Sequence, residues 1–342
     1  MQTEASSRMP DKSKTIAVIC GGLSPEADVS RLSASRITPC LEEHYGNVVH
    51  LELDATLGEQ LIAHQVDVAF PVAHGPYGED GRLQGLLDIM GVPYVGSGAL
   101  ASACSLDKVV TKRLLQPSGI TMAKDRVVYR NESHEDAALD CIETLGHKVI
   151  IKPSGQGSGI GVQFAMGYED LMGKLKTGLQ MDDKLLVEEF ITGREITAGV
   201  LHMDDYQVLP VTEITTPDGA WYDYVHRYTP GLSDHVIPAR ISDEQYRKVQ
   251  EIALKAHQTL GCQDLSRSDF IVPETGEPVF AELNNLPGMT PTSLFPDGAR
   301  HAGIPFDALI CKLVDQALKR GENMRNGREY WPIPKLDIHQ PL

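Results

Sequence analysis

Two short apolar runs near the carboxyl end constrain the fold of this chain more than any other feature. Residues 270–272 and 279–281 are apolar, and a segment containing Gly and Pro separates them, which predicts two antiparallel strands joined by a turn. Asp269 precedes the first run, whereas Glu282 and Asn284 end the second strand. Because side chains two residues apart leave the same face of a strand, Glu282 and Asn284 point together and Asp269 can reach them. Three hard oxygen donors suit Mg²⁺, although a polar rim on the hairpin would give the same pattern.

Size and charge narrow the class of protein. The 342 residues are enough for two or three domains with a substantial core. The formal net charge of −16 argues against a nucleic-acid-binding surface, but a nucleotide site needs only a few local cations and backbone amides. No apolar run approaches the roughly 18–20 residues of a membrane helix, and the amino terminus lacks a signal-peptide core. The charge and the absence of long apolar runs lead us to expect that the protein binds neither nucleic acid nor membrane. The six cysteines form no CxxC pair, so we expect them to be reduced thiols in a cytoplasmic protein.

The first hundred residues alternate predicted strands with helices. Strand-like runs cover residues 15–20, 48–53, 66–72 and 91–96. This alternation indicates a parallel sheet covered on both faces. Ligands bind at the carboxyl ends of strands in such sheets, where the loops 21–26, 74–81 and 96–98 gather. Glu26 and His74 lie in two of these loops, although a loop histidine is often only a solvated polar residue.

A glycine-rich segment, residues 155–161, follows a strong predicted strand in the middle of the chain. Its glycines let backbone N–H groups turn toward an anion, and Ser158 adds a hydroxyl, so the segment is suited to covering phosphates. It is not a Walker A sequence, and a plain glycine-rich hairpin would explain the same residues. Lys152, at the end of the preceding strand, is a natural charge partner for a phosphate. Glu188 and Glu195 could hold an adenine amino group and ribose hydroxyls, although each taken singly reads as a surface acid.

Seven short motifs follow one another along the chain. The first four are Gly21-Gly22-x-Ser24-x-Glu26-x-x-Val29-Ser30, His74-Gly75-x-x-Gly78-Glu79-Asp80-Gly81-x-x-Gln84-Gly85, Asp107-Lys108, and Lys152-Pro153-x-x-x-Gly157-Ser158-x-x-Gly161. The others are Glu188 with Glu195, Tyr222-Asp223-Tyr224-x-x-Arg227-Tyr228, and Arg267-x-Asp269-Phe270 with Glu282-x-Asn284-x-x-Pro287-Gly288-Met289-Thr290. In this order, over roughly residues 15–320, they resemble the D-alanine–D-alanine ligase family of ATP-grasp enzymes.

The resemblance implies an α/β fold of the ATP-grasp type in three domains. An N-terminal parallel-sheet domain, residues 14–103, would bind the first D-alanine. A central α+β subdomain, 104–192, and a C-terminal α+β catalytic subdomain, 193–322, would hold ATP between them. Residues 1–13 and 323–342 are expected to be tails. The family also leads us to expect a homodimer.

The implied reaction is the ATP-dependent ligation of two D-alanines to D-alanyl-D-alanine for peptidoglycan precursor synthesis. The carboxylate of the first D-alanine attacks the γ-phosphate to give an acyl phosphate, which the amine of the second D-alanine then attacks. Two readings stay open beside it. One is a related ligase that takes D-serine, D-lactate or another acceptor, and the other is a nucleotide-binding module without ligase activity. A nucleotide-binding module without ligase activity should lack a residue that binds metal or phosphate, and none of these residues is missing from the sequence.

For ATP and metal, the resemblance assigns roles to named positions. It implies that Lys108 and Lys152 hold phosphates, Glu188 meets the adenine amino group beside the backbone of Phe190 and Ile191, Glu195 holds the ribose, and Arg227 approaches the γ-phosphate from a lid. Asp269, Glu282 and Asn284 would bind two Mg²⁺ (or Mn²⁺) ions.

For the amino acids, the resemblance assigns a second set. Glu26 would bind the ammonium of the first D-alanine with His74 nearby, Arg267 and the N–H of Gly288 would form an oxyanion hole, and Ser293 and Leu294 would line the second subsite. Ser158, Glu26 and Tyr228 would form a hydrogen-bonded trio that links the phosphate loop, the first subsite and the lid, residues 222–235.

Several positions depart from the family pattern, among them Ala27 and Asp28, where a larger residue and a glutamate are common. Gly159 stands where a second serine is common, Arg227 replaces a lysine before the lid tyrosine, and Asn285 replaces a threonine. Arginine keeps the charge but has a longer planar fork, so its phosphate contact can differ. These departures leave the reaction class intact and bear on the rate and the acceptor, while Tyr228 favours D-alanine as acceptor.

Overall fold

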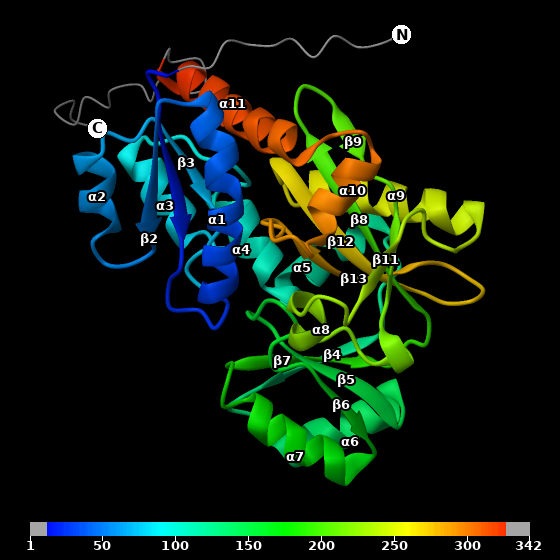
Figure 1. The fold of residues 1–342 in the computed structure, drawn as a ribbon. Coiled ribbons are helices and arrows are strands. Elements are labelled where there is room, and N and C mark those ends of the chain that lie inside the picture. The colour runs from blue at the N-terminus through cyan, green and yellow to red at the C-terminus, as the bar shows by residue number, and fades with distance from the viewer. Residues whose placement is uncertain (1–11, 326–342) are drawn as a thin grey trace, which may run out of the picture.

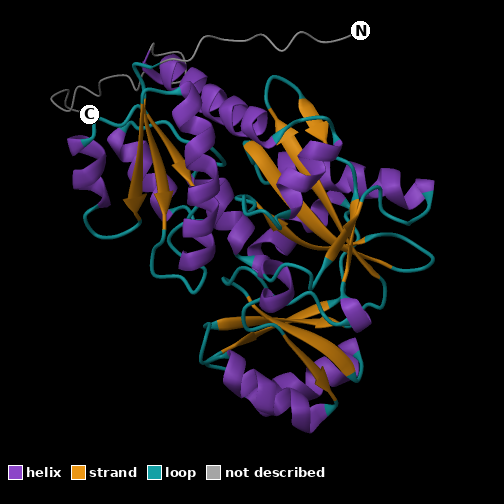
Figure 2. Cartoon of the chain, viewed as in Figure 1, coloured by secondary structure: helices purple, strands orange, loops and turns teal. Residues whose placement is uncertain are grey.

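The structure is a computed structural model that describes residues 12–325, and its strands form three separate sheets (Figures 1 and 2). One sheet is parallel and lies at the amino end, whereas the other two are antiparallel. The predicted α/β fold class is thereby confirmed. The expected tails, residues 1–13 and 323–342, lie almost wholly outside the described residues. Within residues 12–325, no helix combines the length and apolar character needed to cross a bilayer.

The N-terminal unit is a parallel sheet in the strand order β2-β1-β3, flanked by helices (Figure 1). Its elements are β1 Thr15–Cys20, α1 Ala27–His44, β2 Asn47–Glu52, α2 Leu57–Ala63, β3 Val68–Pro71, α3 Arg82–Met90 and α4 Ala99–Leu106. The fourth strand expected at residues 91–96 is reduced to one parallel bridge between Ala69 and Tyr94. Pro93 has no N–H to donate, which keeps the ladder from extending.

The central unit is a four-stranded antiparallel sheet with two helices on one face, at the lower end of Figure 1. Its elements are β4 Asp125–Tyr129, α6 His134–Leu145, β5 Lys148–Pro153, β6 Gln163–Met166, α7 Tyr168–Gly178 and β7 Lys184–Glu189, and the strand order is β4-β7-β5-β6. The glycine-rich segment joins β5 to β6. This unit has its own apolar core, to which Val149 of the sheet, Cys141 of α6 and Leu171 of α7 belong.

The C-terminal unit is built on an antiparallel sheet in the order β11-β10-β8-β12-β13, with β9 paired to β8. Its strands are β8 Arg194–His202, β9 Tyr206–Val208, β10 Thr212–Thr215, β11 Asp234–Val236, β12 Asp264–Val272 and β13 Val279–Asn284. Its helices are α8 Tyr224–Tyr228, α9 Asp243–Thr259, α10 Leu294–His301 and α11 Phe306–Arg325. The predicted hairpin is confirmed, because β12 and β13 pair antiparallel with Asp269 opposite Glu282 and Arg267 opposite Asn284.

Helix α5, Lys108–Leu115, connects the first two units, and the single turns η1, Gln116–Ser118, and η2, Pro217–Gly219, complete the described elements. Leu115 of α5 packs in an apolar core with residues of β8, β12 and α9. Asp107 caps α5 by accepting a hydrogen bond of 3.0 Å from the backbone N–H of Val110. This cap and packing fix the direction in which the polar side of α5 points.

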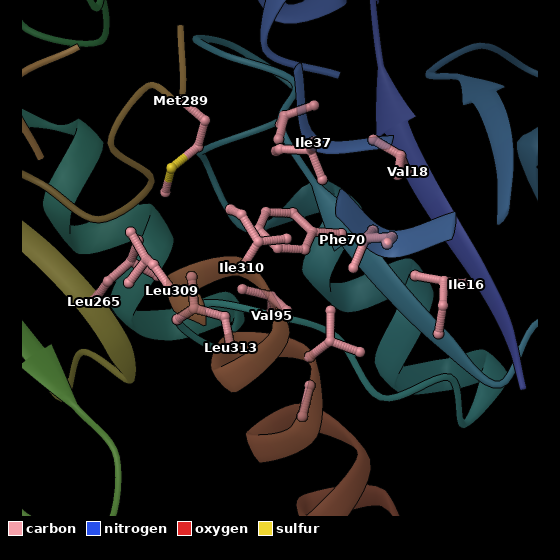
Figure 3. Close-up of a cluster of buried hydrophobic side chains, with 14 of the residues drawn as sticks. Ile16, Val18, Ile37, Phe70, Val95, Leu265, Met289, Leu309, Ile310 and Leu313 are labelled. Atoms are coloured by element: carbon pink, nitrogen blue, oxygen red, sulfur yellow. The ribbon is translucent and has the colours of Figure 1, made fainter. Parts of the chain in front are cut away.

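One continuous apolar core joins the N-terminal and C-terminal units (Figure 3). Ile16 and Phe70 from the parallel sheet, Leu265 from β12, and Ile310 and Leu313 from α11 all belong to it. Every one of these side chains is almost completely removed from water. Because apolar burial is the main favourable term in folding, the two units are expected to fold as one body.

A buried carboxylate reinforces this junction. Asp264, at the start of β12, accepts hydrogen bonds of 2.7 Å from the backbone N–H of Gly96 and from Arg320 Nη2. Arg320 Nη2 also donates to the carbonyl of Tyr94 at 2.7 Å. Asp264 has a φ of 58°, a left-handed conformation that costs energy for a residue with a side chain and is held by these contacts. We call Asp264, Arg320 and Gly96 the Asp264 clamp.

Candidate active site

Two adjoining cavities lie where the three units meet. The first, the Glu26 cavity, is lined by residues of all three units, including Glu26, His74, Ser158, Tyr228, Arg267, Gly288, Ser293 and Leu294. The second, the Lys152 cavity, is lined among others by Lys152, Gly159, Glu195 and Asp269. Lys108, Arg227 and Glu282 face both, so the two cavities share a charged wall.

Glu26, Ser158 and Tyr228, each from a different unit, meet in the Glu26 cavity. Ser158 Oγ donates a short hydrogen bond to Glu26, and it lies 2.7 Å from Tyr228 Oη. A Cβ added at Gly157 would lie 2.9 Å from Glu26 Oε2, so a larger residue there would push the Glu26 carboxylate away. Burial, with Glu79 nearby, raises the pKa of Glu26, and burial also raises the pKa of Tyr228. The structure thus brings together the three residues that were expected to form a trio.

His74 lies beside this trio with one ring nitrogen free. His74 Nδ1 is 3.5 Å from Glu79 Oε1, and the other oxygen of Glu79 accepts a 2.6 Å hydrogen bond from the N–H of Gly75. Burial alone would lower the pKa of His74, but Glu79 and Glu26 raise it above its usual value. His74 Nε2 and Glu26 Oε2 are buried and have no hydrogen-bond partner among the described residues. Since buried polar atoms are nearly always paired, these two atoms are suited to receiving a polar ligand.

The far wall of the Glu26 cavity comes from β12 and the segment after β13. Arg267 forms a two-pronged pair with Asp269, with Nε to Oδ1 at 2.9 Å and Nη2 to Oδ2 at 2.8 Å. A Cβ at Gly288 would lie 2.9 Å from Ser293 Oγ and 3.9 Å from His74 Nε2, so a larger residue would crowd the cavity. Ser293 Oγ accepts a 2.9 Å hydrogen bond from the N–H of Thr290, which folds the segment back on itself. Leu294 follows as the first residue of α10.

Arg36, which no sequence motif singles out, supports this segment on the side away from the cavity. Arg36 of α1 donates to the carbonyls of Met289 and Thr290 at 3.1 and 2.6 Å. Its guanidinium carbon also lies 3.7 Å from the centre of the Phe306 ring, a cation–π arrangement. The partners are backbone carbonyls more than 250 positions away, so no local pattern around Arg36 could have indicated the contact.

In the Lys152 cavity, lysines and carboxylates are already paired. Lys152 Nζ lies 2.6 Å from Glu188 Oε2, and Lys108 Nζ lies 3.4 Å from Glu282 Oε2 and donates to the carbonyl of Gln156 at 2.6 Å. Burial alone would lower the pKa of Lys152, but Glu188 raises it overall. A second buried lysine, Lys112, lies 2.5 Å from the other oxygen of Glu188. Nothing in the sequence around Lys112 indicates this partner.

Asp269, Glu282 and Asn284 share one face of the β12–β13 hairpin, as their spacing predicted. Asp269 lies opposite Glu282 in the ladder, and Asn284 lies two residues further along. Burial would raise the pKa of Glu282, but Lys108, Arg227, Lys152 and Arg267 lower it to about 2, so it is ionised. Within residues 12–325, no group of three or more His, Cys, Asp or Glu side chains is placed to hold a metal. Two carboxylates and an amide suit Mg²⁺ only when phosphate oxygens and water complete the shell.

Of the remaining residues predicted to bind the nucleotide, some line the Lys152 cavity and others do not. Burial raises the pKa of Glu195, which lines the cavity, to about 7. Arg227 stacks on Tyr222 at 4.7 Å from the ring centre and donates to the Tyr222 carbonyl at 3.3 Å. Glu188, Phe190 and Ile191 are not part of the lining, and Lys152 stands between Glu188 and the cavity. Phe190 uses its N–H in a 3.2 Å hydrogen bond to the carbonyl of Lys148.

Comparison with known proteins places this geometry in a family. Models described as "D-ala D-ala ligase C-terminus" and "D-ala D-ala ligase N-terminus" match residues 114–315 and 49–97. A D-alanine–D-alanine ligase of Desulforamulus reducens is 41% identical over 310 residues, covering 89% of this chain and 99% of that protein.

Solved structures agree with the sequence matches. A D-alanine–D-alanine ligase from Bacillus anthracis, solved in complex with ATP, aligns with a TM-score of 0.77 at 28% identity, over 91% of this chain and 99% of that one. The VanG D-Ala:D-Ser ligase from Enterococcus faecalis aligns with a TM-score of 0.75 at 31% identity, over 89% and 99%. With its ATP-grasp architecture and these matches along most of its length, the chain belongs to the D-alanine–D-alanine ligase family.

Proposed function

We propose that this chain joins two D-alanines to D-alanyl-D-alanine, with conversion of ATP to ADP and phosphate, to supply a peptidoglycan precursor. The observation that carries this is the wall shared by the two cavities, formed by Lys108, Arg227 and Glu282. A γ-phosphate in the Lys152 cavity would meet, at this wall, the carboxylate of an amino acid held in the Glu26 cavity. Family membership supports the same reaction.

ATP would occupy the Lys152 cavity. Lys108 and Lys152 would bind its phosphates, and Glu195 its ribose hydroxyls. Glu188 would accept from the adenine amino group once Lys152 moves to a phosphate, with the backbone of Phe190 and Ile191 beside the base. The glycine-rich segment with Ser158 would close over the phosphates, since Ser158, Gly159 and Gly161 have the positive φ values that allow backbone N–H groups to turn toward an anion.

Asp269, Glu282 and Asn284 would bind two Mg²⁺ or Mn²⁺ ions together with the phosphates. Such ions, when bound, neutralise the triphosphate and stabilise charge on the transferring phosphoryl group. The pairing of Asp269 with Arg267 then has to loosen, which leaves Arg267 free to face the other cavity.

The amino acids would bind in the Glu26 cavity. The unpartnered Glu26 Oε2 would accept from the ammonium of the first D-alanine, and the raised pKa of His74 favours an N–H at Nε2 that can donate to its carboxylate. That carboxylate attacks the γ-phosphate to give an acyl phosphate and ADP. The amine of the second D-alanine, held near Ser293 and Leu294, attacks the acyl carbon, and phosphate leaves. Arg267 and the N–H of Gly288 would stabilise the tetrahedral oxyanion, and the lid carrying Arg227 and Tyr228 would exclude water.

We also propose a division of the chain into three domains. The amino-acid-binding domain would be residues 14–103, the ATP-grasp domain 104–192 and the catalytic domain 193–322. The protein would work in the cytoplasm as a homodimer, without a nucleic-acid or membrane partner.

The test is phosphate release with product analysis. The purified protein with ATP, Mg²⁺ and D-alanine should release one phosphate per D-alanyl-D-alanine formed, and L-alanine in the same assay should give background only. D-serine and D-lactate would then compete with D-alanine across pH. A product dominated by D-alanyl-D-serine or a depsipeptide would replace the acceptor assignment, and the absence of ATP turnover with any D-amino acid would overturn the proposal.

A further inference from the structure

We propose that Lys112 is a positioning residue that makes the nucleotide site selective for adenine, by holding Glu188 as a fixed hydrogen-bond acceptor. The inference rests on the proposed function, in which Glu188 meets the adenine amino group. Lys112 would touch neither ATP nor the amino acids. It lies on α5, whereas Glu188 lies on β7 of the central unit.

The two oxygens of Glu188 are shared between two lysines. Lys112 Nζ lies 2.5 Å from Oε1, and Lys152 Nζ lies 2.6 Å from Oε2. The Glu188 side chain is only 2% exposed, so its charge depends on these two cations. Burial alone would raise the pKa of Glu188, but Lys152 and Lys112 together lower it below its usual value.

The two lysines differ in what else they can reach. Lys152 lines the Lys152 cavity and is therefore free to turn to a phosphate. Lys112 lines neither cavity, and its ammonium is fully engaged. Besides Glu188, it donates to the carbonyl of Ala123 at 2.7 Å and lies 3.1 Å from Asp125 Oδ1. Three partners around one buried ammonium match its three N–H donors.

A second cation keeps this anchor in place. Asp125 is itself paired with Arg113, whose Nη2 lies 2.6 Å from Oδ2. Arg113 and Lys112 are neighbours on α5, and the cap at Asp107 fixes the start of that helix. Lys112 therefore stays on Glu188 Oε1 whichever way Lys152 turns.

The consequence concerns base recognition. When a phosphate takes Lys152, Glu188 Oε2 loses its partner while Lys112 still holds Oε1 and keeps the carboxylate ionised. An ionised carboxylate can only accept hydrogen bonds, so it fits the 6-amino group of adenine. It opposes the 6-carbonyl of hypoxanthine or guanine, because two acceptors would face each other without a proton. Without Lys112, Glu188 would take up a proton more readily and could donate to that carbonyl.

Lys112→Met tests this by replacing the ammonium with an apolar side chain of similar length. The KM for ATP should rise about tenfold or more, and the preference for ATP over inosine triphosphate in kcat/KM should fall about tenfold, while kcat stays within about threefold. Lys112→Arg should restore most of the preference. The matched control is Lys176→Met, since Lys176 is an exposed lysine of α7, and it should behave as wild type.

Glu188→Gln separates this inference from the proposed function. If Lys112 acts through Glu188, the double variant Lys112→Met/Glu188→Gln should lose no more preference than Glu188→Gln alone. Should Lys112→Met prove insoluble, Lys112→Gln, which keeps an N–H donor, gives the same comparison. A normal preference for ATP in a folded Lys112 variant, when Glu188→Gln loses it, overturns the inference alone. An unchanged ATP KM and base preference in Glu188→Gln would overturn the adenine site itself.

Discussion

The two cavities of the site are prepared for their ligands in opposite ways. In the Glu26 cavity, Glu26 Oε2 and His74 Nε2 are buried without partners. In the Lys152 cavity, the carboxylates of Glu282 and Glu188 and the lysines beside them are already joined in ion pairs. A small zwitterion can bind to the two unpartnered atoms of the first cavity, whereas the phosphates of a polyanion that enters the second must displace carboxylates from the lysines.

This contrast predicts different responses to substitution. Removing an unpartnered group should weaken the binding of one ligand and leave the rest of the site intact. Removing one member of an ion pair should leave the charge of its partner uncompensated, so the effect reaches the other groups that contact that partner.

The largest effect is expected at Glu282, where the charges of the shared wall converge. Glu282→Gln should lower kcat at least about a thousandfold, because a metal ligand is lost and Lys108 and Arg227 lose their counter-ion. Steady-state phosphate release, with Mg²⁺ titrated over a wide range, measures this. Glu277→Gln, at the exposed turn of the same hairpin, is the control and should be neutral. Turnover within tenfold of wild type in Glu282→Gln would remove the metal assignment.

A smaller and more selective effect is expected at His74. His74→Ala should raise the KM for the first D-alanine about tenfold to a hundredfold, since one charge-assisted hydrogen bond to its carboxylate is lost. The KM for ATP should change less than about twofold, because no nucleotide contact is altered. If both KM values rose together, the two cavities would not be independent and the contrast between them would fail.

A pH dependence should appear on the nucleotide side. Because burial raises the pKa of Glu195 to about 7, this side chain holds its proton at pH 6 and is ionised at pH 8. Ribose hydroxyls donate more strongly to the ionised form, so the KM for ATP should fall about threefold to tenfold as pH rises through that window. Glu195→Gln, measured in parallel, corrects for the titration of ATP itself and should show a flatter profile. Identical profiles would show that Glu195 does not contact the nucleotide.

An effect of similar size is expected at Arg36, which acts only through the segment that it supports. Arg36→Met removes two hydrogen bonds to carbonyls beside Gly288 while keeping an unbranched apolar stem. We expect kcat to fall about threefold to tenfold, since the N–H of Gly288 would be less well placed, with little change in the KM for ATP. Arg36→Lys should recover part of the loss. A fall in thermal stability with unchanged kcat would assign Arg36 a purely structural part.

The sequence predicted the β12–β13 hairpin well, because the pairing of adjacent strands depends on residues close together in the chain. Asp269, Glu282 and Asn284 are fixed to one face by the period of the strand and by a short turn, and the structure confirms that arrangement. The parallel sheet was equally visible in its apolar runs. The expected fourth strand is only one bridge, because Pro93 interrupts the hydrogen-bond ladder. The apolar residues around Pro93 had suggested a full strand.

The contacts that the sequence did not predict are made with residues far away in the chain. Lys112 is buried against Glu188 and the carbonyl of Ala123, and the half-buried Arg36 donates to the carbonyls of Met289 and Thr290. A lysine or arginine on an amphipathic helix is usually solvated, and its sequence neighbours do not reveal that another unit will cover it. Only the tertiary arrangement turns these cations into parts of the site.

The continuous core between the N-terminal and C-terminal units, closed by the Asp264 clamp, decides how the molecule can open. Separating those two units would expose the side chains around Phe70 and Ile310 to water, whereas the central unit keeps its own core wherever it moves. We therefore expect the central unit to move as a rigid body, by a hinge motion, relative to the joined N-terminal and C-terminal units. The closed position of the central unit depends on the hydrogen bonds of Ser158 with Glu26 and Tyr228. The rate of dipeptide release should therefore depend on how fast these hydrogen bonds break.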